Sequence, residues 1–322
     1  MERPTPVLVV TGFLGSGKTT LINRVLAERH GERIAVVVNE FGDVPIDGRL
    51  VVSSDEEVVE LANGCVCCTV RGDLVDTLRE LLARRRRKLF KSRPFERLLI
   101  ETSGLASPGP VAQTLLIEPE LAQELAPATV VALANAERVP LQLVEHPEVE
   151  EQVGYADLLL LNHTDRVDEA GLARAEASLR ARNKLAPIER TERSAADLQR
   201  LFALEAVDRD ERLSRLPEGV HGHSEGAGTV VLQHTGELDL HRLKMWLQFL
   251  ANRRTHELWR LKGILACQGE ARPVVVQGVY QWLEIGPGEG EPPERSSLVL
   301  IGRDLDEEEL RRGWSNVVGA TG

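Results

Sequence analysis

The chain has 322 residues, 42% apolar and 28% charged, which is typical of a globular protein with about two domains of roughly 100–200 residues. Its 39 basic and 50 acidic residues give a net charge of −11, which disfavours general binding to nucleic acid, because that binding depends on neutralising phosphates. No apolar run approaches the ~20 residues that cross a bilayer, and the run at 7–10 is too short for a signal peptide core. We therefore expect a cytoplasmic protein without membrane contact.

Short apolar runs alternate with helical patterns over the first half of the chain. Runs that are apolar at consecutive positions are typical of strands buried on both faces of a parallel sheet. Strand, helix and strand in repetition predict an α/β fold with helices on both faces of that sheet, here over residues 1–190. The expected strands are residues 7–10, 34–38, 98–100, 129–133 and 158–161. The first expected helix carries Leu21, Ile22, Val25 and Leu26 on one face.

The rest of the chain divides into a linker and a smaller domain. Residues 191–227 are dense in charge, then rich in glycine, and include His221 and His223, so we expect a helical and linker segment. Residues 228–322 predict a second α/β domain. Its expected strands are residues 229–232, 258–265, 274–285 and 298–301, with a helix at 240–250. The pair Asp304 and Glu307 has the spacing of a capping box that opens a final helix.

Residues 12–19 read Gly-Phe-Leu-Gly-Ser-Gly-Lys-Thr and fit the phosphate-binding pattern G-x-x-x-x-G-K-[ST]. The motif follows an expected strand and opens an expected helix, where main-chain N–H groups wrap phosphates. Lys18 is expected to reach the β- and γ-phosphates, and the Thr19 hydroxyl to ligate Mg²⁺. The alternative is a glycine-rich turn without a ligand. The nucleotide-binding residues expected in this P-loop are Gly12, Gly15, Ser16, Gly17, Lys18, Thr19 and Thr20.

Two later strand ends supply further candidates for a nucleotide site. Glu101, after residues 98–100, takes the place of the usual Mg²⁺-binding aspartate, and Gly104 is expected to offer its N–H to the γ-phosphate. Asn162 and Asp165 fit the guanine-reading pattern Asn-Lys-x-Asp, in which the carboxylate accepts hydrogen bonds that adenine does not offer. His163 takes the place of the lysine. GTP is therefore the expected nucleotide and ATP the alternative. If there is no nucleotide site here, Glu101 caps the next element and residues 162–165 form a plain turn.

Three thiols lie within four positions, at Cys65, Cys67 and Cys68. Because disulfide frameworks belong to small secreted chains, a C-x-C-C cluster here is interpreted as a metal site, with Zn²⁺ the expected ion. Buried inert cysteines and a redox sensor are the alternatives. Cys267 stands alone in a strand pattern and is interpreted as a core thiol. Glu40 follows the second expected strand and is a candidate ligand of Mg²⁺ or of the thiol-bound metal; the alternative is a solvated loop acid.

The run Arg84-Arg85-Arg86-Arg87-Lys88 is the strongest basic feature of the chain. Such a run can bind RNA or an acidic partner. No aromatic residues of the kind that stack bases surround it. We interpret it as the solvated end of a helix that begins near Asp73, because cations are favourable at a helix C-terminus.

Taken together, these motifs resemble the CobW-like GTPases, relatives of the nickel-inserting GTPases of hydrogenase and urease maturation. The matching segments are residues 12–20, 39–42, 46–48, 64–68, 72–74, 101–105 and 162–165, and in the second domain 260–265, 276–279 and 300–303. The departures are His163 in place of lysine, Asp43 and Pro45 after residues 39–42, and a histidine tract reduced to His221 and His223. The resemblance implies a P-loop NTPase sheet followed by a CobW-type C-terminal domain.

The same resemblance implies a GTP-hydrolysing metallochaperone that binds zinc, with cobalt as the second candidate, at the C-x-C-C thiolates and delivers it to a client metalloprotein. Lys18, Thr19 and Glu101 would act on Mg-GTP, and nucleotide state would set the metal affinity. A P-loop phosphotransferase or ATPase with structural thiols is one alternative. A metal- or redox-responsive regulatory protein is the other.

Overall fold

The computed structural model describes residues 4–28, 31–38, 57–60, 70–86, 95–204, 226–254 and 257–318. The chain forms two compact units. The N-terminal unit comprises Met1–Leu179 and Leu185–Ala203, and the C-terminal unit comprises Arg180–Lys184 and Leu204–Gly322. The domain limits expected at residues 190 and 227 stay predictions. In the described part of the chain, none of the helices combines the length and the apolar character needed to cross a bilayer.

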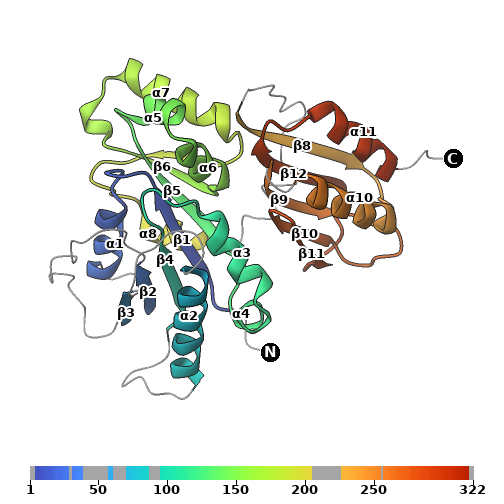
Figure 1. Ribbon diagram of the computed structural model, residues 1–322, viewed down its shortest axis with the longest axis horizontal. Helices are drawn as coiled ribbons and strands as arrows, with labels where there is room; N and C mark the ends of the chain where they lie inside the picture. The colour runs from blue at the N-terminus through green and yellow to red at the C-terminus, as the bar shows by residue number, and fades with distance from the viewer. Residues whose placement is uncertain are drawn as a thin grey trace. The chain divides into compact units, whose positions relative to one another are not determined.

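A seven-stranded parallel sheet forms the centre of the N-terminal unit, with helices on both faces (Figure 1). This confirms the predicted fold class. The strand order is β3-β2-β4-β1-β5-β6-β7. The strands are β1 (Val7–Gly12), β2 (Ile34–Val38), β3 (Glu57–Glu60), β4 (Arg97–Glu101), β5 (Thr129–Asn135), β6 (Leu158–Asn162) and β7 (Ile188–Arg190). The five strands expected from consecutive apolar residues are present, and β3 and β7 are additional.

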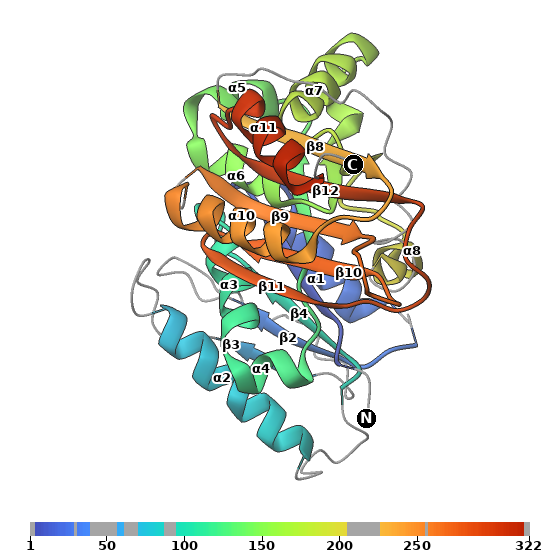
Figure 2. The same ribbon diagram turned by 90° about the vertical axis from the view of Figure 1, so that its right-hand side faces the viewer.

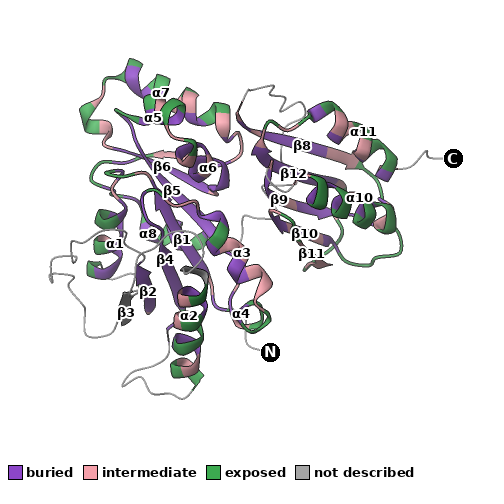
Figure 3. Ribbon diagram, viewed as in Figure 1, coloured by how far each residue is buried: buried purple, intermediate pink, exposed green. Residues whose placement is uncertain are grey.

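The helices of this unit pack their apolar sides onto that sheet. They are α1 (Lys18–Ala27), α2 (Val70–Arg86), α3 (Gly109–Ile117), α4 (Pro119–Glu124), α5 (Val139–Glu145), α6 (Pro147–Tyr155), α7 (Glu169–Arg182) and α8 (Leu198–Ala203), with a 3-10 turn, η1 (Thr164–Arg166). Every residue of β1, β2, β4, β5 and β6 is buried (Figure 3). The predicted face of α1 is buried too, at Leu21, Ile22, Val25 and Leu26.

The basic run ends α2, which begins at Val70, three residues before Asp73. Arg84 pairs with Glu80 on the same helix at 2.5 Å, and Arg86 pairs with Glu124 of α4 at 2.7 Å. Arg85 donates to the Thr5 hydroxyl at 2.5 Å. The described part of this run is therefore a helix end whose cations bind neighbouring side chains, in agreement with the interpretation above.

The C-terminal unit is a five-stranded antiparallel sheet with two helices on one face (Figure 2). Its order is β11-β10-β9-β12-β8. The elements are β8 (Ala227–Thr235), α10 (Leu240–Arg253), β9 (Leu258–Leu265), β10 (Val274–Val279), β11 (Trp282–Pro287), β12 (Arg295–Arg303) and α11 (Glu307–Val318). The single strand expected over residues 274–285 is wrong: it is a hairpin that turns at Tyr280, whose φ is 53°.

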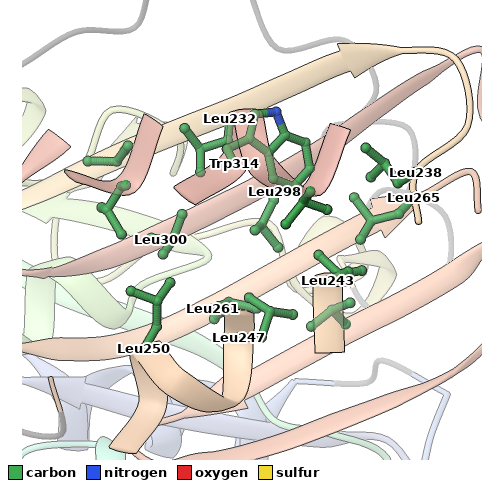
Figure 4. Close-up of a cluster of buried hydrophobic side chains, with 14 of the residues drawn as sticks. Leu232, Leu238, Leu243, Leu247, Leu250, Leu261, Leu265, Leu298, Leu300 and Trp314 are labelled. Carbon is green, nitrogen blue, oxygen red and sulfur yellow. The ribbon is translucent and has the colours of Figure 1, made fainter. Parts of the chain in front are cut away.

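Leucines from both layers fill the core of this unit (Figure 4). Leu243, Leu247 and Leu250 of α10 are buried in that core, and Cys267 belongs to it, so the prediction of a core thiol is confirmed. The expected cap of the last helix is wrong. The Asp306 carboxylate, not that of Asp304, accepts the N–H of Glu309 at 2.9 Å.

Candidate functional site

The loop between β1 and α1 requires glycine at specific points. Gly12 and Gly17 have φ values of 139° and 107°, which L side chains rarely adopt. A Cβ on Gly12 would lie 2.3 Å from the main-chain oxygen of Leu133 on β5, and one on Gly17 would lie 2.3 Å from Nδ2 of Asn162 on β6. The close approach of the loop to two neighbouring strands is therefore possible only without these side chains.

The polar side chains of this loop differ in exposure. Lys18 is buried, and its Nζ donates to the main-chain oxygens of Gly12 at 2.8 Å and Phe13 at 3.3 Å. The ammonium group is thereby held within the turn of the loop. The Ser16 hydroxyl is buried and has no hydrogen-bond partner among the described residues. Thr19 and Thr20 are exposed on the first turn of α1.

The end of β4 lies beside this loop. Glu101 is buried and pairs in register with Val10 of β1. The next residue, Thr102, joins the two strand ends: its hydroxyl donates to that of Thr11 at 2.8 Å. Two residues on, a Cβ on Gly104 would lie 2.5 Å from the Leu14 side chain. The fold thus brings Glu101 and Gly104 to the P-loop at the carboxyl edge of the sheet, where open α/β sheets bind ligands.

Asn162, at the end of β6, is fully buried and bonded on both sides of its amide. Its Nδ2 donates to the main-chain oxygen of Ser16 at 2.9 Å and to the Ser194 hydroxyl at 3.0 Å. Its Oδ1 accepts the Ser194 N–H at 2.9 Å and the Thr191 hydroxyl at 3.3 Å. All these contacts are within the protein, so Asn162 fixes the P-loop against β6 and the segment that follows β7.

The next three residues turn out of β6 toward solvent. His163 has a φ of 62°, and its Nε2 lies 3.3 Å from the main-chain oxygen of Gly15. Because a carbonyl only accepts, this contact places the proton on Nε2. Asp165 is exposed on η1. The carboxylate predicted to read guanine is therefore accessible, while His163 contacts the P-loop.

Ser194 is a site residue that the sequence interpretation missed. Its hydroxyl donates to the main-chain oxygen of Gly17 at 2.9 Å, and its own main-chain oxygen accepts from Nη1 of Arg24 at 2.6 Å. It has a φ of 56° and lies in residues 191–227, which the sequence predicts to be a helical and linker segment. No local motif marks it, because it follows the charge-rich residues 189–193 and its bonding partners are distant in the sequence.

The donor set near the P-loop fits Mg²⁺, which prefers hard oxygen ligands. The Thr19 hydroxyl is exposed on the helix turn that follows the phosphate loop, and Glu101 ends the adjacent strand. Glu40, Cys65, Cys67 and Cys68 lie outside the described residues. Within the described ranges, no group of three or more His, Cys, Asp or Glu side chains forms a metal site.

Both parts of the chain match models of known protein families. Residues 6–190 match the model of the CobW/HypB/UreG nucleotide-binding domain, and residues 227–318 match that of the cobalamin synthesis protein CobW C-terminal domain. The zinc chaperone YjiA of Escherichia coli is 33% identical, over 98% of this chain and 99% of that protein. The zinc chaperone CobW of Pseudomonas aeruginosa is also 33% identical, over 94% of this chain and 88% of the relative.

A solved structure agrees with these sequence matches. The crystal structure of Zn(II)-bound YjiA GTPase from Escherichia coli superposes with a TM-score of 0.77 and 29% identity, covering 98% of this chain and 99% of that one. Both the sequence and the fold are thus shared over nearly the full length. The resemblance stated from the motifs is confirmed, and the chain belongs to the CobW/HypB/UreG family.

Proposed function

We propose that this P-loop GTPase is a zinc metallochaperone, which holds Zn²⁺ on Cys65, Cys67 and Cys68 and passes it to a client metalloprotein under nucleotide control. The similarity to relatives named zinc chaperones supports the cargo. The proposed nucleotide binding rests on one observation. Hydrogen bonds of Asn162 and Ser194 join the P-loop to the segment that contains Asp165.

Phosphate binding is assigned to the loop of residues 12–20. Its glycines turn main-chain N–H groups toward the phosphates, and Lys18 would leave its carbonyl partners to offset phosphate charge. Thr19 and Glu101 would hold Mg²⁺, which supplies charge neutralisation between the β- and γ-phosphates when bound. Gly104 is assigned to the γ-phosphate, because it lies against the P-loop residue Leu14.

Guanine selection is assigned to Asp165. Its exposed carboxylate can accept from the N1–H and 2-amino groups of guanine, and adenine lacks both donors. Asn162 holds the P-loop beside this segment through its hydrogen bonds to Ser16 and Ser194. Replacement of Asp165 by Asn should therefore weaken GTP binding far more than ATP binding.

The direction of the strands supports a coupling between nucleotide and metal. The thiols lie between β3 and α2 in the sequence, and Glu40 follows β2. Both strands are parallel to β1 and so end at the edge of the sheet from which the P-loop leaves. We infer that Mg-GTP tightens the thiol site and that hydrolysis loosens it, as γ-phosphate contacts order switch segments in other GTPases. By linkage, zinc must then tighten GTP binding by the same factor.

The test is a competitive Zn²⁺ titration against a chromophoric chelator, without nucleotide, with Mg-GDP and with a non-hydrolysable GTP analogue plus Mg²⁺. Zinc affinity is expected to rise tenfold or more with the analogue, about 1.4 kcal/mol of coupling. The Cys65, Cys67, Cys68→Ser variant should lose this zinc binding. Cys267→Ser is the matched control, since that thiol is buried in the C-terminal unit and should leave zinc binding unchanged.

Each outcome separates the candidate functions. Equal zinc affinity in every nucleotide state would overturn the switch, and the thiols would then be static or redox groups. Turnover with a second phosphate acceptor would favour a phosphotransferase. A Co²⁺ titration in the same format measures whether the site prefers zinc to cobalt. The Irving–Williams order gives only the general trend of affinities and does not identify the metal of this site. Transfer to an apo client metalloprotein, compared for GTP and its analogue, tests delivery.

A further inference from the structure

The helix layer of the C-terminal unit has an apolar hollow at its surface. The hollow has a volume of about 550 Å³, and its apolar lining comes from Met245, Trp246 and Phe249 of α10 and Val317 of α11. Met245 and Phe249, one helical turn apart, are 63% and 49% exposed, although side chains of this kind are among those most often buried. Both lie outside the core that α10 forms with the sheet. α10 therefore has a second apolar stripe that the described residues of this unit leave exposed.

A close approach of the two helices forms the floor of this hollow. A Cβ atom on Gly313 would lie 2.0 Å from Nε1 of Trp246, so only glycine fits at this point of α11. The half-buried Trp246 ring lies 6.1 Å from that of Trp314, centroid to centroid. Nη1 of Arg242 reaches the main-chain oxygen of Asn316 at 3.4 Å. The hollow is thus built from packed and bonded residues.

Basic groups of α10 border the hollow, and none of the described residues that line it is acidic. α10 carries no carboxylate, and its side chains His241 and Arg242 line the hollow. The guanidinium group of Arg253 lies 5.5 Å from the centroid of the Phe249 ring. The acidic residues of α11 lie in its first turn, where Glu309 pairs with Arg254 beyond the end of α10. One carboxylate adjoins the other end, that of the capping Asp239, 3.4 Å from Arg242. On a chain with a net charge of −11, this is a local excess of positive charge around exposed apolar groups.

We propose that the hollow between α10 and α11 is a docking site for an acidic segment of a partner protein that carries large apolar side chains. An amphipathic helix laid into an apolar groove is a recurrent mode of peptide recognition. The apolar side chains of the segment enter the hollow, and its carboxylates face the basic groups of α10. Complementary charge steers the encounter and rejects basic segments. A membrane surface is a poorer fit, because membrane-binding helices present a convex apolar ridge and this surface is concave.

The test uses a fluorescein-labelled helical peptide of about 14 residues, with Leu at positions i, i+3, i+4 and i+7 and Glu at most other positions. Fluorescence anisotropy with the full chain should show saturable binding. Two control peptides replace Glu by Lys, or Leu by Gln, and each should bind at least tenfold more weakly. The variant Met245→Gln, Phe249→Gln should weaken binding of the acidic peptide by tenfold or more, and Arg253→Glu should weaken it in the same direction.

The matched control is Leu141→Gln, Val144→Gln, which removes two apolar side chains of the N-terminal unit that are 61% and 77% exposed. It should bind the acidic peptide as the unmodified chain does. GTP hydrolysis should be the same in all variants, which separates this site from the nucleotide site. No binding of the acidic peptide, equal binding of the basic one, or unchanged binding by the α10 variant would each overturn the proposal. Two further results would overturn it if the acidic peptide does not bind. One is self-association of the chain in sedimentation velocity, and the other is flotation with anionic vesicles, in each case abolished in the α10 variant.

Discussion

Nε2 of Gln152, on α6, donates to the main-chain oxygen of Gly104 at 3.1 Å and to that of Ala106 at 3.0 Å. Gln152 is only 1% exposed, and its Oε1 has no partner among the described residues. Because Gly104 lies against Leu14 of the P-loop, this one amide holds the loop that follows β4 at its distance from the phosphate site. Gln152 is therefore a positioning residue for the proposed γ-phosphate contact.

Replacement of Gln152 by Glu should slow GTP hydrolysis. The substitution keeps the shape of the side chain but sets a carboxylate oxygen against two carbonyl oxygens, so the loop must move. A misplacement of about 1 Å can cost about 10²-fold in rate, so we expect kcat to fall by roughly 10–100-fold while KM for GTP changes less. Steady-state hydrolysis with purified protein measures both constants.

The matched variant is Gln152→Met, which removes the donor without adding repulsion. It should lose less activity than the Glu variant, and the melting temperatures of both show whether the fold persists. Equal kcat values for all three proteins would mean that the loop needs no anchor from α6.

The contact of His163 with Gly15 predicts a graded effect on nucleotide affinity. His163→Ala removes the N–H donor, and a hydrogen bond of this kind contributes about 0.5–1.5 kcal/mol, so the Kd for GTP should rise about 2–10-fold. His163→Lys restores an N–H donor on a side chain long enough to reach Gly15. Both replacements adopt the same positive φ at residue 163, so the cost of that backbone conformation is common to the two variants. Titration with a fluorescent GTP analogue should rank Lys near the unmodified chain. An Ala variant of full affinity would show that the contact adds nothing.

Two glycines of the P-loop should respond very differently to alanine. At Gly12 the added Cβ meets the main-chain oxygen of Leu133 at 2.3 Å, whereas at Gly15, with a φ of 69°, nothing lies within 4 Å. Gly15→Ala should cost about 1–2 kcal/mol for the left-handed conformation alone. Gly12→Ala adds overpacking of about 1–3 kcal/mol. Urea unfolding of the nucleotide-free proteins measures the difference, and equal midpoints would contradict the proposed overlap with β5.

The sequence predicts the central strands well because burial on both faces leaves a consecutive apolar signal. It misses β3, which has glutamates at both ends, and β7, which has only three residues. The phosphate loop, Glu101 and Asp165 are visible as local motifs. Ser194 and Gln152 are not, because their roles depend on contacts 32 to 177 residues away along the chain.

The errors in the C-terminal unit have the same origin. A continuous apolar pattern over residues 274–285 does not reveal the turn at Tyr280, since that turn has neither Gly nor Pro at its centre. Asp304 and Asp306 both precede the last helix, and sequence spacing favoured the first. In the structure the Asp304 carboxylate accepts the N–H of Gly226 at 2.9 Å, which leaves Asp306 to cap α11.

Cys267 offers a pH-dependent readout of the C-terminal unit. Burial raises the pKa of its thiol from 9.0 to about 11, and Glu270 adds to the shift. Because the folded pKa lies above the unfolded one, the stability that this group contributes is fully present below pH 9 and is lost as the pH rises toward 11. The free energy of unfolding should therefore fall over this range more steeply in the unmodified chain than in Cys267→Ser. The other three cysteines are present in both proteins, so their titration cancels in the difference. Parallel stability curves from pH 8 to 11, measured by urea unfolding of the two proteins, would show that the buried thiol titrates as it does in the unfolded chain.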